Sequence, residues 1–144
     1  DGSWEPACIE LKSGGVLMLM RTGLGGQYKS ISKDGGETWS APIETPLKGT
    51  AAPVSISRIP GTGELLAIWN HNPGAPSRNP LTSAISKDEG ETWEHFRNIE
   101  EAPDDAWAYP AVTWVGENAL LTYFNYAGGD SLQLKIVPAA WFRE

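Results

Sequence analysis

The sequence has one cysteine, few basic residues and no long apolar run, and each shortage excludes a class of protein. Cys8 is the only cysteine among 144 residues, so no disulfide can form within the chain. Eleven Lys and Arg residues against 18 Asp and Glu give a net charge of −7, which argues against nucleic acid as a partner. No apolar run approaches the roughly 20 residues of a membrane span, so we expect none.

Long helical periods are also missing, and short apolar runs bounded by Gly and Pro take their place. This pattern is typical of an all-β protein. We predict strands at residues 6–11, 16–22, 27–33 and 38–44, then at 53–59, 64–70, 81–87 and 92–98, and finally at 109–115, 119–125 and 132–142.

One turn sequence occurs twice. SISKDGGETWS (30–40) returns as AISKDEGETWE (84–94), 54 residues later and in the same register. Repeated four-stranded units of this length indicate a β-propeller. We predict one partial propeller domain over residues 1–144, with blades at approximately 4–50, 51–100 and 107–144, the last lacking its fourth strand. Because about four to eight blades are needed for closure, we expect the remaining blades of a longer chain, or a second copy, as a partner.

The repeated turn, S-x-D-x-G-x-T-W, resembles the Asp-box (BNR repeat) of sialidases and several other propeller families. An Asp side chain can bond the backbone N–H groups of its own turn, Gly permits the turn geometry, and Trp can pack beneath the hairpin. We therefore predict a structural role, in preference to ligand or metal binding, and no metal or cofactor. The residues concerned are Ser32, Asp34, Gly36, Thr38, Trp39, Ser86, Asp88, Gly90, Thr92 and Trp93.

Antiparallel pairing within each unit sorts the loops between two edges of the propeller. The Asp-boxes, as turns between third and fourth strands, share one edge. Most of the informative polar and aromatic residues fall on the opposite edge, where we expect the functional face. They are Glu5, Arg21, Tyr28, Asn70, His71, Arg78, Trp107 and Tyr109.

The resemblance to sialidases extends to three of the segments on this edge. WEPACIELKSGGVLMLMRT resembles the segment in which a catalytic Glu lies five residues before a Glu-Leu pair and an Arg lies eleven after it. Glu5 and Arg21 keep both spacings. SRNPLTSAISKDEG resembles the segment in which a second arginine precedes the Asp-box serine by eight residues, as Arg78 precedes Ser86. WAYPAVTWV resembles the segment of the nucleophilic tyrosine, which would be Tyr109.

The resemblance implies the C-terminal half of a six-bladed sialidase propeller and an exo-acting hydrolase of α-linked sialic acid. Arg21 and Arg78 would bind the substrate carboxylate, for which arginine is well suited. Tyr109 would be the nucleophile, since a neutral group avoids repulsion by that carboxylate, and Glu5 would accept its proton. The family's acid/base Asp and third arginine have no counterpart in this sequence. Relatives of this kind act on external glycans, which implies an extracellular or periplasmic location.

Two other functions remain open from the sequence. An Asp-box propeller could bind glycan or protein without turnover, or the same arginines could serve a hydrolase of another anionic sugar. Tyr28 and Trp107 either line the sugar pocket or pack in the fold. Asn70 and His71 are candidate substrate contacts on the same rim.

Overall fold

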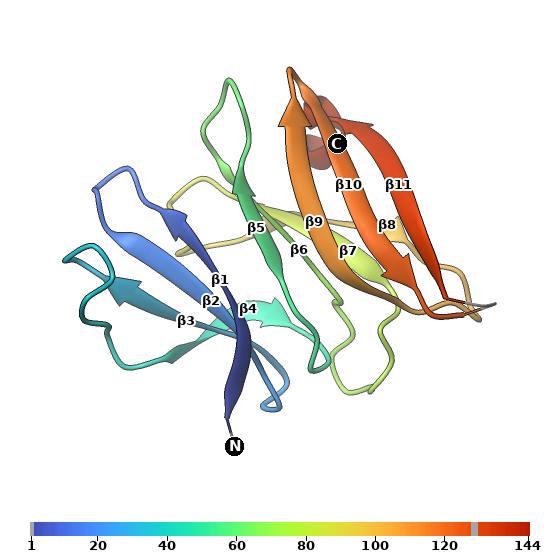
Figure 1. The fold of residues 1–144 in the computed structure, drawn as a ribbon, viewed down its shortest axis with the longest axis horizontal. Helices are drawn as coiled ribbons and strands as arrows, with labels where there is room; N and C mark the ends of the chain where they lie inside the picture. The colour runs from blue at the N-terminus through green and yellow to red at the C-terminus, as the bar shows by residue number, and fades with distance from the viewer. Residues whose placement is uncertain (1, 128–129) are drawn as a thin grey trace.

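The computed structural model describes residues 2–127 and 130–144, which form three antiparallel sheets (Figure 1). The first comprises β1 (Ser3–Glu10), β2 (Val16–Thr22), β3 (Gly26–Ser32) and β4 (Ile43–Lys48). The second comprises β5 (Ser55–Arg58), β6 (Leu65–Trp69), β7 (Leu81–Ser86) and β8 (Glu94–Glu100). The third comprises β9 (Trp107–Val115), β10 (Asn118–Asn125) and β11 (Ser131–Pro138), and a 3₁₀ helix, η1 (Ala139–Arg143), follows it.

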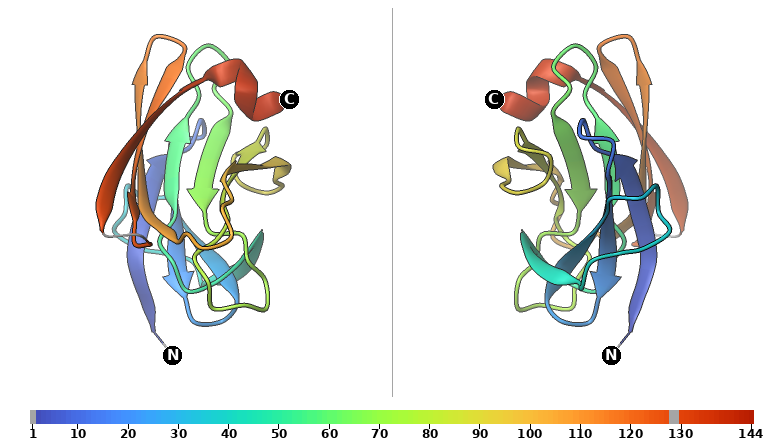
Figure 2. Two further views of the ribbon diagram at one scale, coloured as in Figure 1. Left: turned by 90° about the vertical axis from the view of Figure 1, so that its right-hand side faces the viewer. Right: turned by 90° about the vertical axis from the view of Figure 1, so that its left-hand side faces the viewer.

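Each sheet is a meander in which every strand pairs with the next in sequence. The first strands of the three sheets lie next to one another, with β5 in contact with both β1 and β9. The sheets are thus arranged as successive blades, seen from two sides in Figure 2. The prediction of an all-β, propeller-type fold with two four-stranded units and one three-stranded unit is confirmed.

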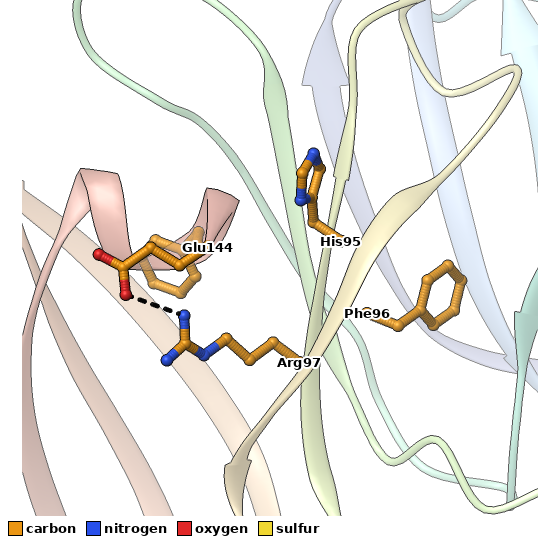
Figure 3. Close-up of a pocket in the computed structure, with 5 residues that line it drawn as sticks. His95, Phe96, Arg97 and Glu144 are labelled. Atoms are coloured by element: carbon orange, nitrogen blue, oxygen red, sulfur yellow. Dashed lines mark hydrogen bonds and ion pairs between the residues drawn. The ribbon is translucent and has the colours of Figure 1, made fainter.

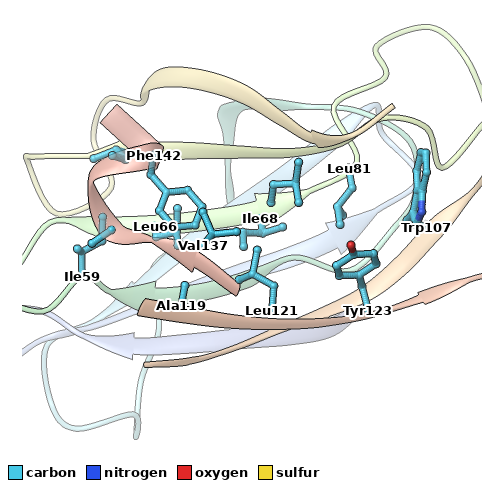
Figure 4. Close-up of a cluster of buried hydrophobic side chains, with 13 residues drawn as sticks. Ile59, Leu66, Ile68, Leu81, Trp107, Ala119, Leu121, Tyr123, Val137 and Phe142 are labelled. Atoms are coloured by element: carbon cyan, nitrogen blue, oxygen red, sulfur yellow. The ribbon is translucent and has the colours of Figure 1, made fainter. Parts of the chain in front are cut away.

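The core consists of apolar side chains packed between the sheets. One cluster joins the first and second sheets, through Leu17 and Leu19 on one side and Leu65 and Trp69 on the other. A second cluster joins the second and third sheets and η1 (Figure 4). Its members include Ile59, Leu66, Ile68, Leu81, Trp107, Ala119, Leu121, Tyr123, Val137 and Phe142.

The third sheet also has apolar side chains that no described residue covers. Leu132, Leu134 and Ile136 alternate along β11 and are 74%, 62% and 62% exposed. Alternation along a strand places them on one face of the sheet. Such a face favours contact with a further blade or with a second copy, which stays a prediction.

Several strand boundaries differ from the sequence prediction, and three of these differences have a clear structural cause. The predicted strands at 38–44 and 92–98 begin later, at Ile43 and Glu94, because the two Asp-box turns hold Thr38 and Thr92. The strand predicted at 132–142 ends at Pro138 and continues as η1. Pro138 is opposite Asn118, the first residue of β10, so no partner strand remains for the residues beyond.

The two Asp-box turns have the same internal hydrogen bonds. Asp34 accepts bonds from the N–H and O–H of Thr38, at 2.9 and 2.5 Å, and from the Ser32 hydroxyl at 2.7 Å. In the second turn, Asp88 accepts the corresponding bonds from Thr92 and from Ser86. Each serine also accepts a hydrogen bond from the N–H of the glycine four residues later, Gly36 or Gly90.

The tryptophans differ between the two turns. Trp39 is half-buried and donates from Nε1 to the Gly36 carbonyl. Trp93 is buried in the cluster between the first and second sheets. Among the described residues no group of three or more His, Cys, Asp or Glu side chains is placed to hold a metal ion.

The Asp88→Asn substitution should flatten the acid dependence of stability. Burial tends to raise the pKa of Asp88, but hydrogen bonds from Thr92 and Ser86 outweigh it and lower the pKa to about 2. That is below the value of about 3.9 expected in the unfolded chain. The stabilisation is therefore present above pH 4 and lost as pH falls towards 2.

We expect the melting temperature of the parent protein to fall more steeply between pH 4 and pH 2 than that of the variant. Asp104→Asn, an exposed change in the loop before β9, is the control and should keep the parent's profile. Parallel profiles for parent and Asp88→Asn would contradict a stabilising role of the ionised carboxylate.

Candidate functional site

The predicted site residues lie on the edge of the sheets opposite the Asp-boxes. Strand register fixes this placement: Trp4 is opposite Arg21, Arg21 is opposite Gln27, and Trp107 is opposite Asn125. In Figure 1 this is the lower edge, with the N-terminus and the β6–β7 loop. Residues far apart in the sequence therefore share one rim.

Glu5 and Tyr109 occupy equivalent bulges in the first strands of the first and third sheets. Each residue precedes a proline, and each lies where the pairing with the second strand shifts register. Their φ angles are 46° and 53°, in a region that non-glycine residues rarely adopt. Bulges and sparsely populated backbone conformations often orient side chains at functional sites.

Glu5 forms an ion pair with Arg21 across β1 and β2. Arg21 Nη1 donates to Glu5 Oε2 at 2.7 Å, and the guanidinium lies 5.8 Å from the centre of the Trp4 ring. The three side chains line a cavity of about 350 Å³. Arg21 Nε is buried and has no hydrogen-bond partner among the described residues, so this arginine retains a donor.

Arg78 lies against two tyrosine rings. Its guanidinium carbon is 5.4 Å from the centre of the Tyr109 ring and 5.7 Å from that of Tyr126. Within residues 2–127 and 130–144, Arg78 is the one arginine that forms no ion pair. The other four, Arg21, Arg58, Arg97 and Arg143, each pair with a glutamate.

The loop that carries Arg78 is fixed by Asn70, the residue directly after β6. The Asn70 side-chain amide donates to the carbonyls of Arg78, Pro80 and Trp107 at 2.8 to 3.1 Å. The Trp107 N–H donates to the Arg78 carbonyl as well. These bonds tie the β6–β7 loop to the start of β9, which also carries Tyr109.

The structure shows the surroundings of the four predicted substrate contacts. Asn70 and Trp107 are buried, at 0% and 3% exposure, and their contact with substrate stays a prediction. His71 bonds the Lys48 carbonyl through Nδ1 and packs edge-on against Trp69. Tyr28 lines a separate cavity on the first sheet, together with residues such as Met20 and Leu24.

The structure also brings in two residues that the sequence reasoning missed, Trp4 and Tyr126. Trp4 is 48% exposed in the cavity of Glu5 and Arg21. Its position directly before Glu5 could have signalled it. Tyr126 follows the last residue of β10, a position on the predicted rim, but its approach to Arg78 depends on tertiary contacts.

Glu5 and Tyr109 themselves are not joined by a hydrogen bond within the described residues. Glu5 is bonded to Arg21, and Tyr109 lies against Arg78. The candidate site therefore has two parts, each with an arginine, an aromatic ring and one of the two predicted catalytic residues.

A further cavity, of about 280 Å³, lies between β8 and η1 (Figure 3). Arg97 lines it but donates to the Trp141 carbonyl and pairs with Glu144. This arginine is therefore already engaged within the fold, unlike Arg78, which has no ion pair among the described residues. In the part of the chain that the structure describes, no helix has the length and apolar character needed to cross a membrane.

Comparison with known protein families shows to which family this chain belongs. The BNR repeat-like domain family matches residues 1–122. The chain belongs to this family. A search of curated proteins found no match to the sequence of this chain.

Solved structures with similar folds include glycosidases of two kinds. An α-L-arabinanase of Penicillium chrysogenum, solved with arabinobiose, has a TM-score of 0.74 at 18% identity, over 94% of this chain and 46% of its own. An α-L-arabinofuranosidase of Fusarium graminearum has a TM-score of 0.76 at 20% identity, over 95% and 45%. An intramolecular trans-sialidase of Ruminococcus gnavus, solved with oseltamivir carboxylate, has a TM-score of 0.77 at 18% identity, over 95% and 33%.

At these identities the similarity establishes the fold. The chain spans less than half the length of each of these three structures. A trans-sialidase and arabinan-degrading enzymes are both similar in fold to this chain, so the fold does not distinguish between their substrates.

Proposed function

We propose that this chain contributes to the active site of a retaining exo-glycosidase that releases sialic acid or a related sugar acid. The observation that carries the proposal is Arg78, which contacts Tyr109 and has no carboxylate partner among the described residues. An unpaired, half-buried guanidinium is a natural receptor for a substrate carboxylate. A neutral arabinose unit would leave this charge unused.

In the proposed reaction, Arg21 and Arg78 bind the substrate carboxylate. The Tyr109 oxygen attacks the anomeric carbon, the bond from that carbon to the leaving oxygen breaks, and a tyrosyl glycoside forms. Glu5 accepts the Tyr109 proton. Water then attacks the same carbon, the bond to the Tyr109 oxygen breaks, and Glu5 returns its proton to that oxygen, with net retention. The group that protonates the first leaving oxygen, and that takes the proton of the water in the second step, is the acid/base Asp for which this sequence has no counterpart.

Because Glu5 is paired with Arg21, we expect substrate binding to precede proton transfer to Glu5. A substrate carboxylate would compete with Glu5 for the N–H groups of Arg21. Binding would thereby free the Glu5 carboxylate to act as a base, directly or through one water.

The test is hydrolysis by the complete protein of a fluorogenic α-sialoside, beside the matching α-L-arabinofuranoside. Hydrolysis of the sialoside, with competition by free sugar acids, would support the proposal. Cleavage of the arabinofuranoside alone would overturn it. Saturable binding of sialylated glycan without turnover would identify a non-catalytic propeller.

Arg78→Lys should raise KM for the sialoside by about 10- to 100-fold, because lysine cannot offer paired N–H groups to a carboxylate. Arg97→Lys is a matched control, because Arg97 also lies over an aromatic ring, with its guanidinium carbon 3.9 Å from the centre of the Trp141 ring. Arg97 lines the cavity between β8 and η1, away from Arg78. We expect its KM to stay within about twofold of the parent. Equal effects of the two substitutions would contradict direct recognition by Arg78.

A further inference from the structure

We propose that Tyr126 is a positioning residue that holds the Arg78 guanidinium in the orientation required to bind the carboxylate of an anionic sugar. This inference rests on the proposed function and assigns a role to a residue outside the predicted site. It is based on the contacts of Tyr126 with Arg78 and with the third sheet.

Tyr126 is itself firmly placed. Its N–H donates to the Ala106 carbonyl at 2.9 Å, which ties the residue to the start of β9. Its ring packs edge-on against Phe124, with ring centres 4.8 Å apart. The backbone and the ring are therefore both anchored, although the side chain is 40% exposed.

A guanidinium that lies over an aromatic ring uses its flat face for that contact. Its N–H groups point outward in its own plane and stay available to a carboxylate. Arg78 has two such ring contacts, with Tyr109 and Tyr126. Either contact restricts the rotation of a side chain that has no ion pair among the described residues.

The second contact matters during the proposed reaction. Tyr109 changes partners when its oxygen bonds to the sugar, and its ring must follow the reacting carbon. Tyr126 has no bond to make in that reaction, so it can keep Arg78 in place throughout. Partial burial raises the pKa of Tyr126, and the neighbouring Tyr109 raises it further, while Arg78 has the opposite effect. The net rise in pKa keeps the Tyr126 side chain uncharged.

Two variants separate the ring from its hydroxyl. Tyr126→Phe keeps the ring, and we expect affinity for N-acetylneuraminic acid within about twofold of the parent. Tyr126→Leu removes the ring, and we expect affinity to fall by about 3- to 30-fold, the range of a cation–π contact. Titration calorimetry measures the affinity of the parent and of both variants for the acid and for its neutral methyl ester.

A positioning role predicts that Tyr126→Leu weakens binding of the acid more than that of the methyl ester. Equal weakening of the two ligands would overturn the proposal, because it would indicate a general structural role. Thermal unfolding of both variants checks that they remain folded.

A second measurement requires no substrate. The Nε–Hε signal of Arg78 in NMR spectra of the complete protein should be displaced by the ring currents of the two tyrosines. Tyr126→Leu should move it towards the position of a free arginine, Tyr126→Phe should not, and the signal of Arg143 should stay unchanged. An Arg78 signal that is insensitive to Tyr126→Leu would overturn the positioning role, whereas failure of the parent to bind either sugar would count against the proposed function alone.

Discussion

Tyr109→Phe is expected to reduce kcat for a fluorogenic α-sialoside by about 10⁴-fold, the largest effect of any single change considered for this protein. Loss of a nucleophile removes the covalent route, and losses of this size or larger follow such substitutions in other hydrolases. Phenylalanine keeps the aromatic ring, so the contact with Arg78 should persist. The effect should therefore appear in kcat, with little change in KM.

The measurement is initial rates for parent and variant, with thermal unfolding to confirm that both are folded. Tyr28→Phe is the control, because Tyr28 lies in a separate cavity on the first sheet. We expect it to retain activity within about twofold. A Tyr109→Phe variant that keeps more than a tenth of the parent's kcat would exclude Tyr109 as the nucleophile.

Gly49→Ala is expected to give the largest loss of stability, about 3 kcal/mol or more in the free energy of unfolding. A Cβ at position 49 would lie 1.9 Å from the Asn70 carbonyl oxygen and 3.1 Å from its carbonyl carbon. Both are backbone atoms, which cannot rotate away as a side chain can. Asn70 in turn holds the Arg78 loop, so movement there should also raise KM for an anionic sugar.

Urea denaturation measures the effect. Gly23→Ala is the matched control, because a Cβ at position 23 would have no neighbour within 4 Å. That change should alter the free energy of unfolding by less than about 1 kcal/mol. Equal stability of the two variants would show that the contact between Gly49 and Asn70 does not constrain the fold.

Much of the scaffold can be predicted from the sequence because it depends on local features. The hydrogen bonds of the repeated turn can be predicted from its sequence, because Asp34 and Asp88 bond residues only two and four positions away. Apolar runs between turns predict the number and order of the strands. The boundaries at Ile43 and Glu94 were placed too early, because β-forming residues such as Thr38 and Thr92 are used by the turn.

The rim could be predicted as well, because antiparallel pairing alternates the edges on which loops fall. The roles of individual residues on it could not. From the sequence, Asn70 is a candidate substrate contact, and Trp107 either lines the sugar pocket or packs in the fold. In the structure Asn70 Nδ2 bonds three carbonyls and Trp107 joins the core. Burial depends on which other segments fold over a residue, and that information is spread along the whole chain.

The sequence by itself determined the propeller blades, the Asp-box turns and the edge that carries Glu5, Arg21, Arg78 and Tyr109, since each follows from short-range pattern and strand alternation. Only the tertiary structure decided how these residues are paired. It joined Glu5 to Arg21 and set Arg78 against Tyr109 and Tyr126. The first pairing depends on the bulge between β1 and β2, and the second on how the β6–β7 loop of the second sheet approaches the third sheet, and no local pattern encodes either distance.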